Sequence, residues 1–349
     1  MFMYPTPLPV LEDHVIDHRE IYDECELKYG KPIDLAIRST YNPKTKKYFG
    51  FSPSFIPCPT NYRKDLWDEV GVFPDTWDDV RIGGRKIKQE HGNPVWISLS
   101  SRQLSRMDLR SIMYSFGASI QDEAGNVVLN SKQTLEAVRF FKALYEEAMT
   151  KEAIYWDDLS CDISDQFIIS GKASLLLSSI SVTRTAEREN PKISKKIQLA
   201  KTPKGPIQRM GQYYMPVYFI WKFADNIEGA KQFLIDYISN FRKAFLASKF
   251  RDFPCFPDTV PDLKKLIAND SRGDPPTKYN VLMDVLDWTG NMGYPGYTNA
   301  AIEEVASMQV IPNMFREAAT MEAKPENVIK DAEAECRRIF NAWREKGRI

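Results

Sequence analysis

The chain has 349 residues, of which 43% are hydrophobic and 12% aromatic, so it holds enough apolar material for a large core and exceeds the usual length of one domain. Lys and Arg total 47, and Asp and Glu also total 47, which leaves no formal net charge. This composition excludes a disordered chain and lacks the basic surplus of a nucleic-acid-binding protein.

Residues 1–9 have neither a basic start nor an apolar core, so we expect no signal peptide in this chain. No segment approaches the roughly 20 apolar residues that cross a bilayer. A helix is predicted over residues 20–28. An extended segment is predicted over residues 47–56, because Pro53, Pro57 and Pro59 exclude a helix in and just after it.

Residues 62–79 predict two short helices separated by a turn. Leu66 and Val70 are four residues apart, which gives the first helix an apolar face. Gly71 suits the left-handed position that ends many helices. Thr76 can cap the second helix, with Asp79 three residues on as the acid of a capping box.

The remaining elements alternate between helices and strands, which predicts an α/β protein. The spacing of Leu135, Val138 and Phe141 makes residues 131–148 the clearest helix. Further helices are predicted over residues 104–116, 227–248, 279–288, 300–319 and 326–343. Strands are predicted over residues 95–99, 173–177, 197–200 and 212–221, and a hairpin turn over 122–126.

Signatures of catalysis and of metal binding are missing from the sequence. It contains no G-x-S-x-G elbow, no P-loop, no H-E-x-x-H and no G-x-G-x-x-G motif. His14 and His18 have a spacing compatible with a metal, but nothing completes a ligand set, so we predict a solvated helix surface there. The five cysteines are far apart and are expected to be mainly free buried thiols. We therefore predict no cofactor, no metal and no catalytic residue.

Several blocks of the sequence together resemble one known family. Residues 62–79 read Y-R-K-D-L-W-D-E-V-G-V-F-P-D-T-W-D-D. This resembles the Y-x-K-D-L-x-x-x-x-G, x-P-x-T-W-x-E signature of the extracellular solute-binding proteins of ABC importers (family 1, carbohydrate-binding type). Similar blocks follow in the family's order at residues 114–118, 167–177, 224–234, 293–319 and 332–340.

The resemblance implies a two-lobed, periplasmic-binding-protein-like (type II) α/β fold with hinge-crossing strands. Residues 1–56 and about 207–258 would form the first lobe, and residues 57–206 and about 259–349 the second. Family members carry further strands and helices ahead of the part matched here, so the resemblance implies that this chain lacks the N-terminal part of its first lobe. Ser178-Ser-Ile-Ser181 stands where the family usually has a sugar-stacking tryptophan, which departs from the carbohydrate-binding pattern.

The function implied by the resemblance is that of a substrate-binding component. It would close its lobes on a small polar solute, a sugar or oligosaccharide, and present the solute to the permease subunits of an ABC transporter. The protein would be an extracytoplasmic monomer, at the periplasm or the outer face of the membrane. It would have no enzymatic activity and no nucleic-acid partner.

Ligand contacts are expected at strand ends and loop starts, because ligands of open α/β sheets lie outside the carboxyl ends of the strands. The predicted ligand-binding residues are Trp96, Ser105, Asp108, Trp156, Ser179, Ser181, Arg184, Tyr213, Tyr214, Asn291, Tyr294 and Tyr297. Trp96 and Trp156 could equally pack in the core, and Arg184 lies among charged residues that suit a solvated surface. Tyr213 and Tyr214 are adjacent on a strand, so at most one of them should face the ligand.

Asp108 is the favoured polar residue for accepting sugar hydroxyls. Two alternatives stay open at the level of sequence. A glycan-active hydrolase would need two carboxylates facing each other across a cleft, for which Asp108, Asp157 and Asp158 are the candidates. A truncated, non-binding remnant of a solute-binding protein is the other alternative.

Overall fold

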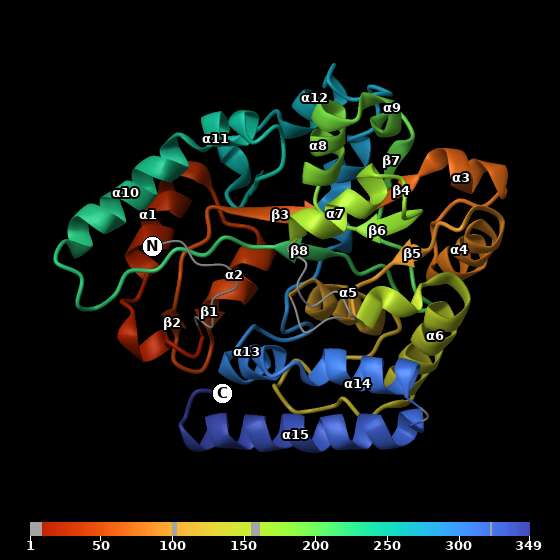
Figure 1. Cartoon of the computed structure of the whole chain (residues 1–349). Coiled ribbons are helices and arrows are strands. Elements are labelled where there is room, and N and C mark those ends of the chain that lie inside the picture. The colour runs from red at the N-terminus through yellow and green to blue at the C-terminus, as the bar shows by residue number, and fades with distance from the viewer. Residues whose placement is uncertain (1–8, 100–102, 155–160, 322) are drawn as a thin grey trace.

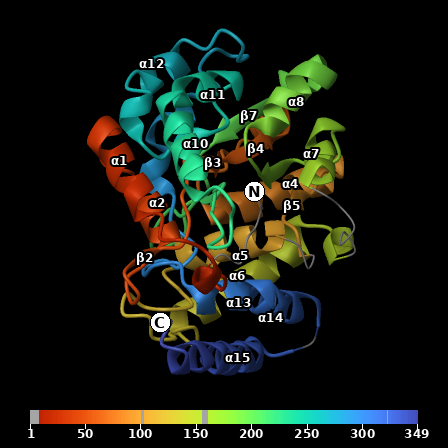
Figure 2. The same ribbon diagram turned by 90° about the vertical axis from the view of Figure 1, so that its left-hand side faces the viewer.

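The computed structural model describes residues 9–99, 103–154, 161–321 and 323–349, with the side chains of 103–105, 154 and 161–164 left aside. Two bodies are visible in Figure 1 and again in Figure 2. One contains the N-terminal helices together with the helices near residue 240. The other contains the central helices and the three C-terminal ones, which lie along the bottom of both views. The predicted α/β fold is confirmed.

The first body is built on a three-stranded antiparallel sheet in the order β8-β3-β9. Its strands are β3 (Ser54–Cys58), β8 (Gln212–Tyr214) and β9 (Phe253–Pro254), with a hairpin of β1 (Tyr41–Asn42) and β2 (Lys47–Tyr48) beside them. Its helical elements are η1 (Glu12–His14), α1 (Arg19–Tyr29), α2 (Asp34–Thr40), α10 (Ile227–Ser239), α11 (Phe241–Ala247), η4 (Pro257–Thr259), α12 (Leu263–Ala268) and η5 (Asn280–Trp288). One apolar cluster joins them, from Ile21 and Phe51 to Phe245 and Trp288.

The second body is built on a four-stranded mixed sheet in the order β5-β6-β4-β7. Its strands are β4 (Thr60–Arg63), β5 (Val95–Trp96), β6 (Leu175–Leu177) and β7 (Ile197–Ala200). Its helical elements are α3 (Lys64–Glu69), α4 (Trp77–His91), α5 (Gln103–Ser115), α6 (Lys132–Ala148), η2 (Lys151–Ile154), α7 (Cys161–Ile169), α8 (Ser181–Glu189), α9 (Pro191–Ser194), α13 (Ala300–Ser307), α14 (Val310–Thr320) and α15 (Pro325–Glu345). The largest apolar cluster fills this body, with Trp67, Phe141 and Phe340 fully buried.

The chain passes between the two bodies at three places. β3 leads into β4 through Pro59, so one nearly continuous extended segment enters both sheets (Figure 1). Residues 201–211 join β7 to β8, and residues 289–299 join η5 to α13. These three segments are the connections between the two bodies in the described part of the chain.

The ends of helices were predicted correctly where a single residue determines them. Thr76 caps α4 in a reciprocal capping box: the Thr76 hydroxyl accepts from the Asp79 backbone N–H at 3.1 Å, and the Asp79 carboxylate accepts from the Thr76 N–H at 2.9 Å. Gly71 has a φ of 69°, a left-handed conformation that glycine adopts without a Cβ clash. Ser131 caps α6, its hydroxyl accepting from the Thr134 N–H at 3.1 Å.

Three predicted helices differ from the structure. The helix predicted over 227–248 is interrupted at Asn240, which ends α10 and begins α11. The helix predicted over 300–319 is split between α13 and α14. Gln309 adopts a φ of 60° there, and Pro312, which lacks an N–H, fits only in the first turn of α14. Residues 280–288 form a 3₁₀ helix with a kink at Asp284.

The strands are shorter than predicted. β5 ends at Trp96, ahead of the predicted end at residue 99, and β6 begins at Leu175, after the predicted start at residue 173. β8 ends at Tyr214, ahead of Pro216, and isolated antiparallel bridges at Tyr218 and Trp221 continue the pairing beyond the proline. The interruption of β8 follows from the missing N–H of proline, which cannot donate to a sheet ladder.

The prediction of a solvated surface at His18 is wrong. His18 is fully buried; its Nδ1 donates to the Tyr48 carbonyl at 3.0 Å, and its Nε2 accepts from the Ile220 N–H at 3.0 Å. Burial lowers the pKa of His18 to about 4, so the ring is neutral and ties α1 to two extended segments. Within the described ranges, no three His, Cys, Asp or Glu side chains are grouped as metal ligands.

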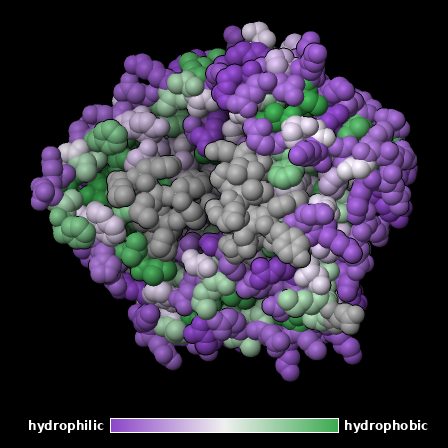
Figure 3. Space-filling view, viewed as in Figure 1, coloured by the Kyte–Doolittle hydropathy of each residue, from purple (hydrophilic) through white to green (hydrophobic). Residues whose placement is uncertain are grey.

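Four cysteines, Cys25, Cys58, Cys255 and Cys336, are buried free thiols, as predicted. On the side of the molecule shown in Figure 3, the coloured residues near the outline are mainly hydrophilic, and the hydrophobic residues form small separate groups. Of the helices that the structure describes, none combines the length and the apolar character that a membrane-spanning helix requires.

Candidate functional site

Polar residues gather where β5 and β6 end. These two strands run parallel, with Val95 opposite Leu175 and Trp96 opposite Leu176, so their carboxyl ends lie at the same edge of the sheet. Ser98 follows β5 and Ser178 follows β6 at this edge, and both are buried. Ligands of α/β proteins commonly bind outside such strand ends.

Asn61 lies on β4, opposite Leu176 of β6, and is fully buried. Its Nδ2 donates to the carbonyl oxygen of Pro59 at 3.2 Å and to that of Ser178 at 2.9 Å. Its Oδ1 has no hydrogen-bond partner among the described residues. Asn61 therefore fixes the β3–β4 crossing to the end of β6 and keeps an acceptor that no described residue uses.

Asp108, on α5, is the polar residue favoured by the sequence, and it is buried at 3% exposure. Its carboxylate accepts from the side-chain Nε2 of Gln212 at 2.5 Å and from the backbone N–H of Ser98. Burial raises the pKa of Asp108 to about 7, against the opposing effect of these two hydrogen bonds. Near neutral pH the carboxyl group therefore exists in both protonation states.

Gln212 begins β8, opposite Cys58 of β3, and is buried. While its Nε2 donates to Asp108, its Oε1 has no partner within the described part of the chain. Ser178 Oγ donates to Asp165 Oδ1 at 2.9 Å at the other end of the group. We call these six residues the hinge polar cluster: Asn61, Ser98, Asp108, Asp165, Ser178 and Gln212.

The hinge polar cluster is chemically suited to a ligand that donates hydrogen bonds. A buried amide oxygen without a donor is costly, at about 1–3 kcal/mol, because it has lost water without gaining a partner. Asn61 Oδ1 and Gln212 Oε1 are two such acceptors among the described residues, and they lie where both bodies meet the crossing strands. A hydroxyl-bearing ligand between the bodies would supply the missing donors.

The two predicted tyrosines point in opposite directions from β8. Tyr213 directs its hydroxyl to Ser39 Oγ of α2 at 2.7 Å, whereas Tyr214 packs with Met107 of α5 and with Cys58. This alternation agrees with the expectation that at most one of them can face a given side of the strand. Both side chains are buried.

The residues predicted after β6 lie on the loop and helix that follow it. Ser179 and Ser181 hydrogen-bond to each other through their hydroxyls at the start of α8. The side chain of Arg184 is only 9% exposed and forms ion pairs with Asp270 and Glu187. The guanidinium of Arg184 is thus held by the first body and does not lie on a solvated surface.

Trp96 lies in the core of the second body. Its ring stacks on Phe167 with ring centroids 3.8 Å apart, in a cluster with Ile168 and Leu176. This is the core-packing alternative for Trp96. Trp156 lies outside the described residues, and Ser105 is placed on α5 by its backbone alone.

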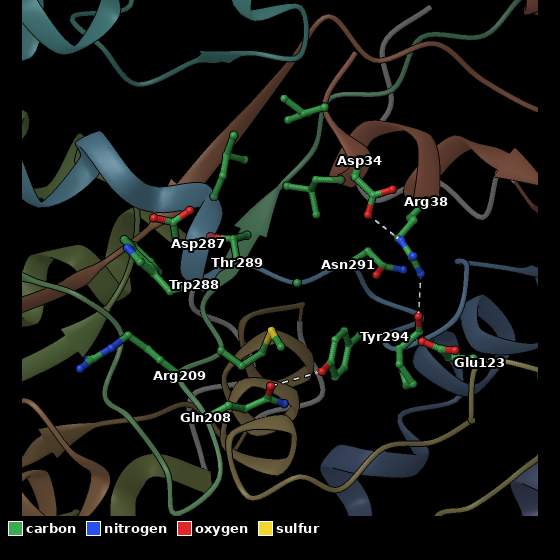
Figure 4. A pocket seen from close by; sticks show the side chains of 16 residues that line it. Asp34, Arg38, Glu123, Gln208, Arg209, Asp287, Trp288, Thr289, Asn291 and Tyr294 are labelled. Atoms are coloured by element: carbon green, nitrogen blue, oxygen red, sulfur yellow. Dashed lines mark hydrogen bonds and ion pairs between the residues drawn. The ribbon is translucent and has the colours of Figure 1, made fainter. Parts of the chain in front are cut away.

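Asn291 and Tyr294 line a separate pocket of about 590 Å³ (Figure 4). Its walls come from α2, from residues 208–210 and from the third crossing. Several of the polar groups shown there are paired with protein atoms: Arg38 with Asp34 at 2.6 Å, and Tyr294 with Gln208 at 3.2 Å. Tyr297 lies nearby, its ring 5.2 Å from the Arg38 guanidinium.

The pocket of Figure 4 differs from the hinge polar cluster in its hydrogen bonding. Arg38 also donates to the Pro295 carbonyl at 2.7 Å, and Asn291 Nδ2 donates to Gly296 O at 2.9 Å. The first bond braces the loop of the third crossing against α2, and the second lies within the loop itself. None of the described residues that line this pocket leaves a buried side-chain polar atom unpaired, in contrast to Asn61 and Gln212 of the cluster.

Sequence reasoning missed Asn61 and Gln212. Both stand at crossings, one after Pro59 and one after Gly211, where the chain leaves one sheet for the other. A polar amide inside a short extended segment flanked by proline or glycine was the available signal. The predicted residues are not brought into one site, because Asp108, Arg184 and Tyr294 lie at three different contacts.

Comparison with known proteins gives one family match. A family model described as "Bacterial extracellular solute-binding protein" matches residues 36–249. A protein of Brucella abortus (strain 2308) named as a binding protein is 23% identical over 214 residues, covering 57% of this chain and 51% of that protein. The chain thus spans about half the length of this curated relative.

Solved structures share the fold over nearly the whole chain. A candidate oligosaccharide periplasmic-binding protein from Synechococcus sp. MITs9220, in complex with zinc, has a TM-score of 0.82 and 14% identity, covering 98% of this chain and 84% of that one. The maltose-bound MalE3 protein of T. maritima has a TM-score of 0.76 and 20% identity, covering 95% and 82%. At these identities the likeness concerns the fold, which is the two-lobed one expected from the sequence.

Proposed function

The chain belongs to the bacterial extracellular solute-binding protein family, and from this premise we propose that it binds a sugar or oligosaccharide between its two bodies. Solute binding without catalysis is the activity of the family. Delivery of the solute to the permease subunits of an ABC importer is part of the proposal, as are a monomeric state and a location in the periplasm or at the outer face of the membrane.

We identify the two bodies with the two lobes of such a receptor. The sequence placed the return to the second lobe at about residue 259. The apolar side chains of Val260, Ile267, Leu282 and Trp288 pack in the first-body cluster, which supports placing that return near residue 289. The first lobe would then comprise residues 9–58 and about 212–288, and the second the remainder.

One observation carries the proposal of a hydroxyl-bearing ligand. Asn61 and Gln212 each bury an amide oxygen that no described residue satisfies, at the strand crossing that would form the floor of the proposed cleft. Sugars present many O–H donors, and each bond to such an acceptor removes the cost of leaving it unpaired. Maltose in the T. maritima neighbour belongs to the same chemical class.

Asp108 adds to this floor a carboxyl group that can both accept and donate hydrogen bonds. When ionised, its carboxylate accepts hydrogen bonds; when protonated, it also donates one. Because burial raises its pKa to about 7, both forms are available near neutral pH. With serine at the position of the family's stacking tryptophan, the proposed ligand is held mainly by hydrogen bonds.

The test is ligand-dependent melting followed by calorimetry. Maltose, laminaribiose, ribitol and amino acids are screened for a rise in melting temperature, and the responding ligand is titrated into wild type and Gln212→Ala. Loss of one ligand bond to a buried acceptor is expected to weaken binding by about 5- to 150-fold. Gln166→Ala, a change at an exposed glutamine on α7, serves as the matched control and should bind like wild type.

Two results would count against the proposal. If no sugar or polyol shifts the melting temperature, the remnant alternative is favoured. If a sugar binds but Gln212→Ala binds it like Gln166→Ala, the ligand lies elsewhere than on the hinge polar cluster. Membership of a solute-binding family speaks against the hydrolase alternative. Of the three candidate carboxylates for that alternative, Asp157 and Asp158 lie outside the described residues.

A further inference from the structure

Helix α8 carries two sets of contacts at once. It follows directly from Ser178 of the hinge polar cluster, through the loop of Ser179 and Ile180. It also faces residues 270–279 of the first body, at the top of the molecule in Figure 1. One short helix therefore connects the proposed ligand floor with the opposite lobe.

The contact centres on Arg184. Its Nη2 forms an ion pair with Asp270, its Nη1 lies 3.2 Å from Glu187 Oε2, and its Cζ lies 3.8 Å from the centre of the Tyr279 ring. The side chain of Asp270 is only 2% exposed, and Arg272 Nε donates to its second oxygen at 2.6 Å. A cation stacked on an aromatic face and paired with a buried carboxylate is strongly held, because water competes poorly for either group.

Tyr279 completes the arrangement from the first body. Its hydroxyl donates to Glu187 Oε1 at 2.8 Å and lies 3.0 Å from Thr183 Oγ1. Tyr279 thus contacts one face of α8 with its hydroxyl while its ring supports Arg184. We define the interlobe latch as Arg184, Glu187, Asp270, Arg272 and Tyr279.

Further bonds extend the contact toward the crossings. Lys278 Nζ donates to the Ser194 carbonyl at 3.0 Å, and Gln198 Nε2 donates to the Asp274 carbonyl at 3.1 Å. Ile180 and Leu199 of the second body also pack in the apolar cluster of the first. The lobes cannot separate along this edge while these bonds and the interlobe latch are intact.

We propose that the interlobe latch holds the two lobes together without ligand and sets the rate at which a bound solute leaves. The part concerning solute release rests on the proposed function, whereas the part concerning the ligand-free lobes does not. Two charges that are paired here away from water give a two-position element, which is either paired as in this structure or open to water. Opening must rupture the Arg184–Asp270 pair, so this pair adds to the barrier for ligand release.

The test compares two arginines of the same helix. Arg184→Met keeps the length of the side chain and removes its charge. Arg188→Met makes the same change at a residue that has 72% side-chain exposure and whose ion pair is with its neighbour Glu189. Small-angle X-ray scattering on the ligand-free proteins should show a larger radius of gyration for Arg184→Met than for wild type. Arg188→Met should match wild type.

A second pair of variants guards against misfolding. Tyr279→Phe removes one hydroxyl and should give an intermediate expansion. Asp270→Asn keeps the shape of the side chain and removes the charge that pairs with Arg184, so it should also give a larger radius than wild type. Equal radii for Arg184→Met, Tyr279→Phe and Arg188→Met would overturn the proposal.

The kinetic readout tests the link to the ligand. With a sugar identified by the melting screen, its dissociation from Arg184→Met, followed by stopped-flow tryptophan fluorescence, should be about tenfold faster than from Arg188→Met. Unchanged dissociation together with an expanded ligand-free form would overturn the coupling to release. Should no sugar bind at all, the proposed function fails while the scattering result still decides whether the interlobe latch exists.

Discussion

Replacing Asp108 with asparagine should change how stability depends on pH. The pKa of Asp108 is raised to about 7 by burial, from 3.8 for an exposed aspartate. Between these values the folded protein keeps a proton that the unfolded chain releases. Stability from this group is therefore fully present below the unfolded pKa and is lost as the pH rises through about 7.

The expected magnitude follows from the two pKa values. Each unit of difference is worth about 1.4 kcal/mol, so wild type should lose about 2.5 kcal/mol from this group between about pH 5 and about pH 8. The amide introduced by Asp108→Asn imitates the neutral acid and cannot ionise. The variant should therefore match wild type or fall slightly below it at the lower pH, and exceed it at the higher pH.

Urea denaturation at both pH values gives the unfolding free energies of wild type and Asp108→Asn. The measured quantity is how much the difference between these two free energies changes with pH. Glu303, on α13, has its pKa raised to about 7 by burial, opposed by Arg106 and Arg110, so it contributes a loss of the same sign to both proteins. Glu303→Gln serves as the control that removes this second contribution. If wild type and Asp108→Asn differ by the same amount at both pH values, the carboxyl group does not hold its proton in the folded state and the reasoning is refuted.

Three further changes test other parts of the fold. Thr76→Ala should cost about 1 kcal/mol in chemical denaturation through loss of the α4 cap, whereas Asp78→Ala in the same turn should cost less. Burial lowers the pKa of His18 to about 4, so its contribution to folding stability is lost as the pH falls below about 6.5. The unfolding free energy of wild type should fall by about 2 kcal/mol between about pH 7 and about pH 5. His18→Gln should lose less stability over the same range. Gly205→Ala would press a Cβ against the backbone carbonyl oxygen of Ser115 and should destabilise the protein by about 2 kcal/mol. Gly71→Ala meets no neighbouring atom and adds only backbone strain, so it should cost about 1 kcal/mol. Equal melting temperatures of the two variants would contradict this distinction.

The sequence predicted those parts of the fold that short-range signals decide. The cap at Thr76, the left-handed Gly71 and the helix at α15 each depend on residues within a few turns. The breaks at Asn240 and Gln309 were missed because each separates two stretches that continue the same helical period. Pro312 indicates the second break already in the sequence, because proline is tolerated only in the first turn of a helix.

The candidate site was harder to predict because it depends on long-range contacts. Asp108 was predicted as a site residue, but its hydrogen-bond partner Gln212 is 104 residues away. The contacts of Asn61 form only when β4 pairs with β6. Arg184 meets Asp270 across 86 residues. No local pattern records which charges a tertiary fold will bring together, so a surface position was the natural expectation for Arg184.

The buried thiols give the protein a practical advantage for optical studies. Burial raises the pKa of Cys25, Cys255 and Cys336 to about 12, which keeps these sulfurs protonated and slow to react with maleimides. After Cys161→Ser, one new cysteine at Leu27 and one at Met308, both exposed, would take dyes on opposite lobes. Energy transfer between such dyes would then measure, in single molecules, whether the proposed rotation of the lobes takes place.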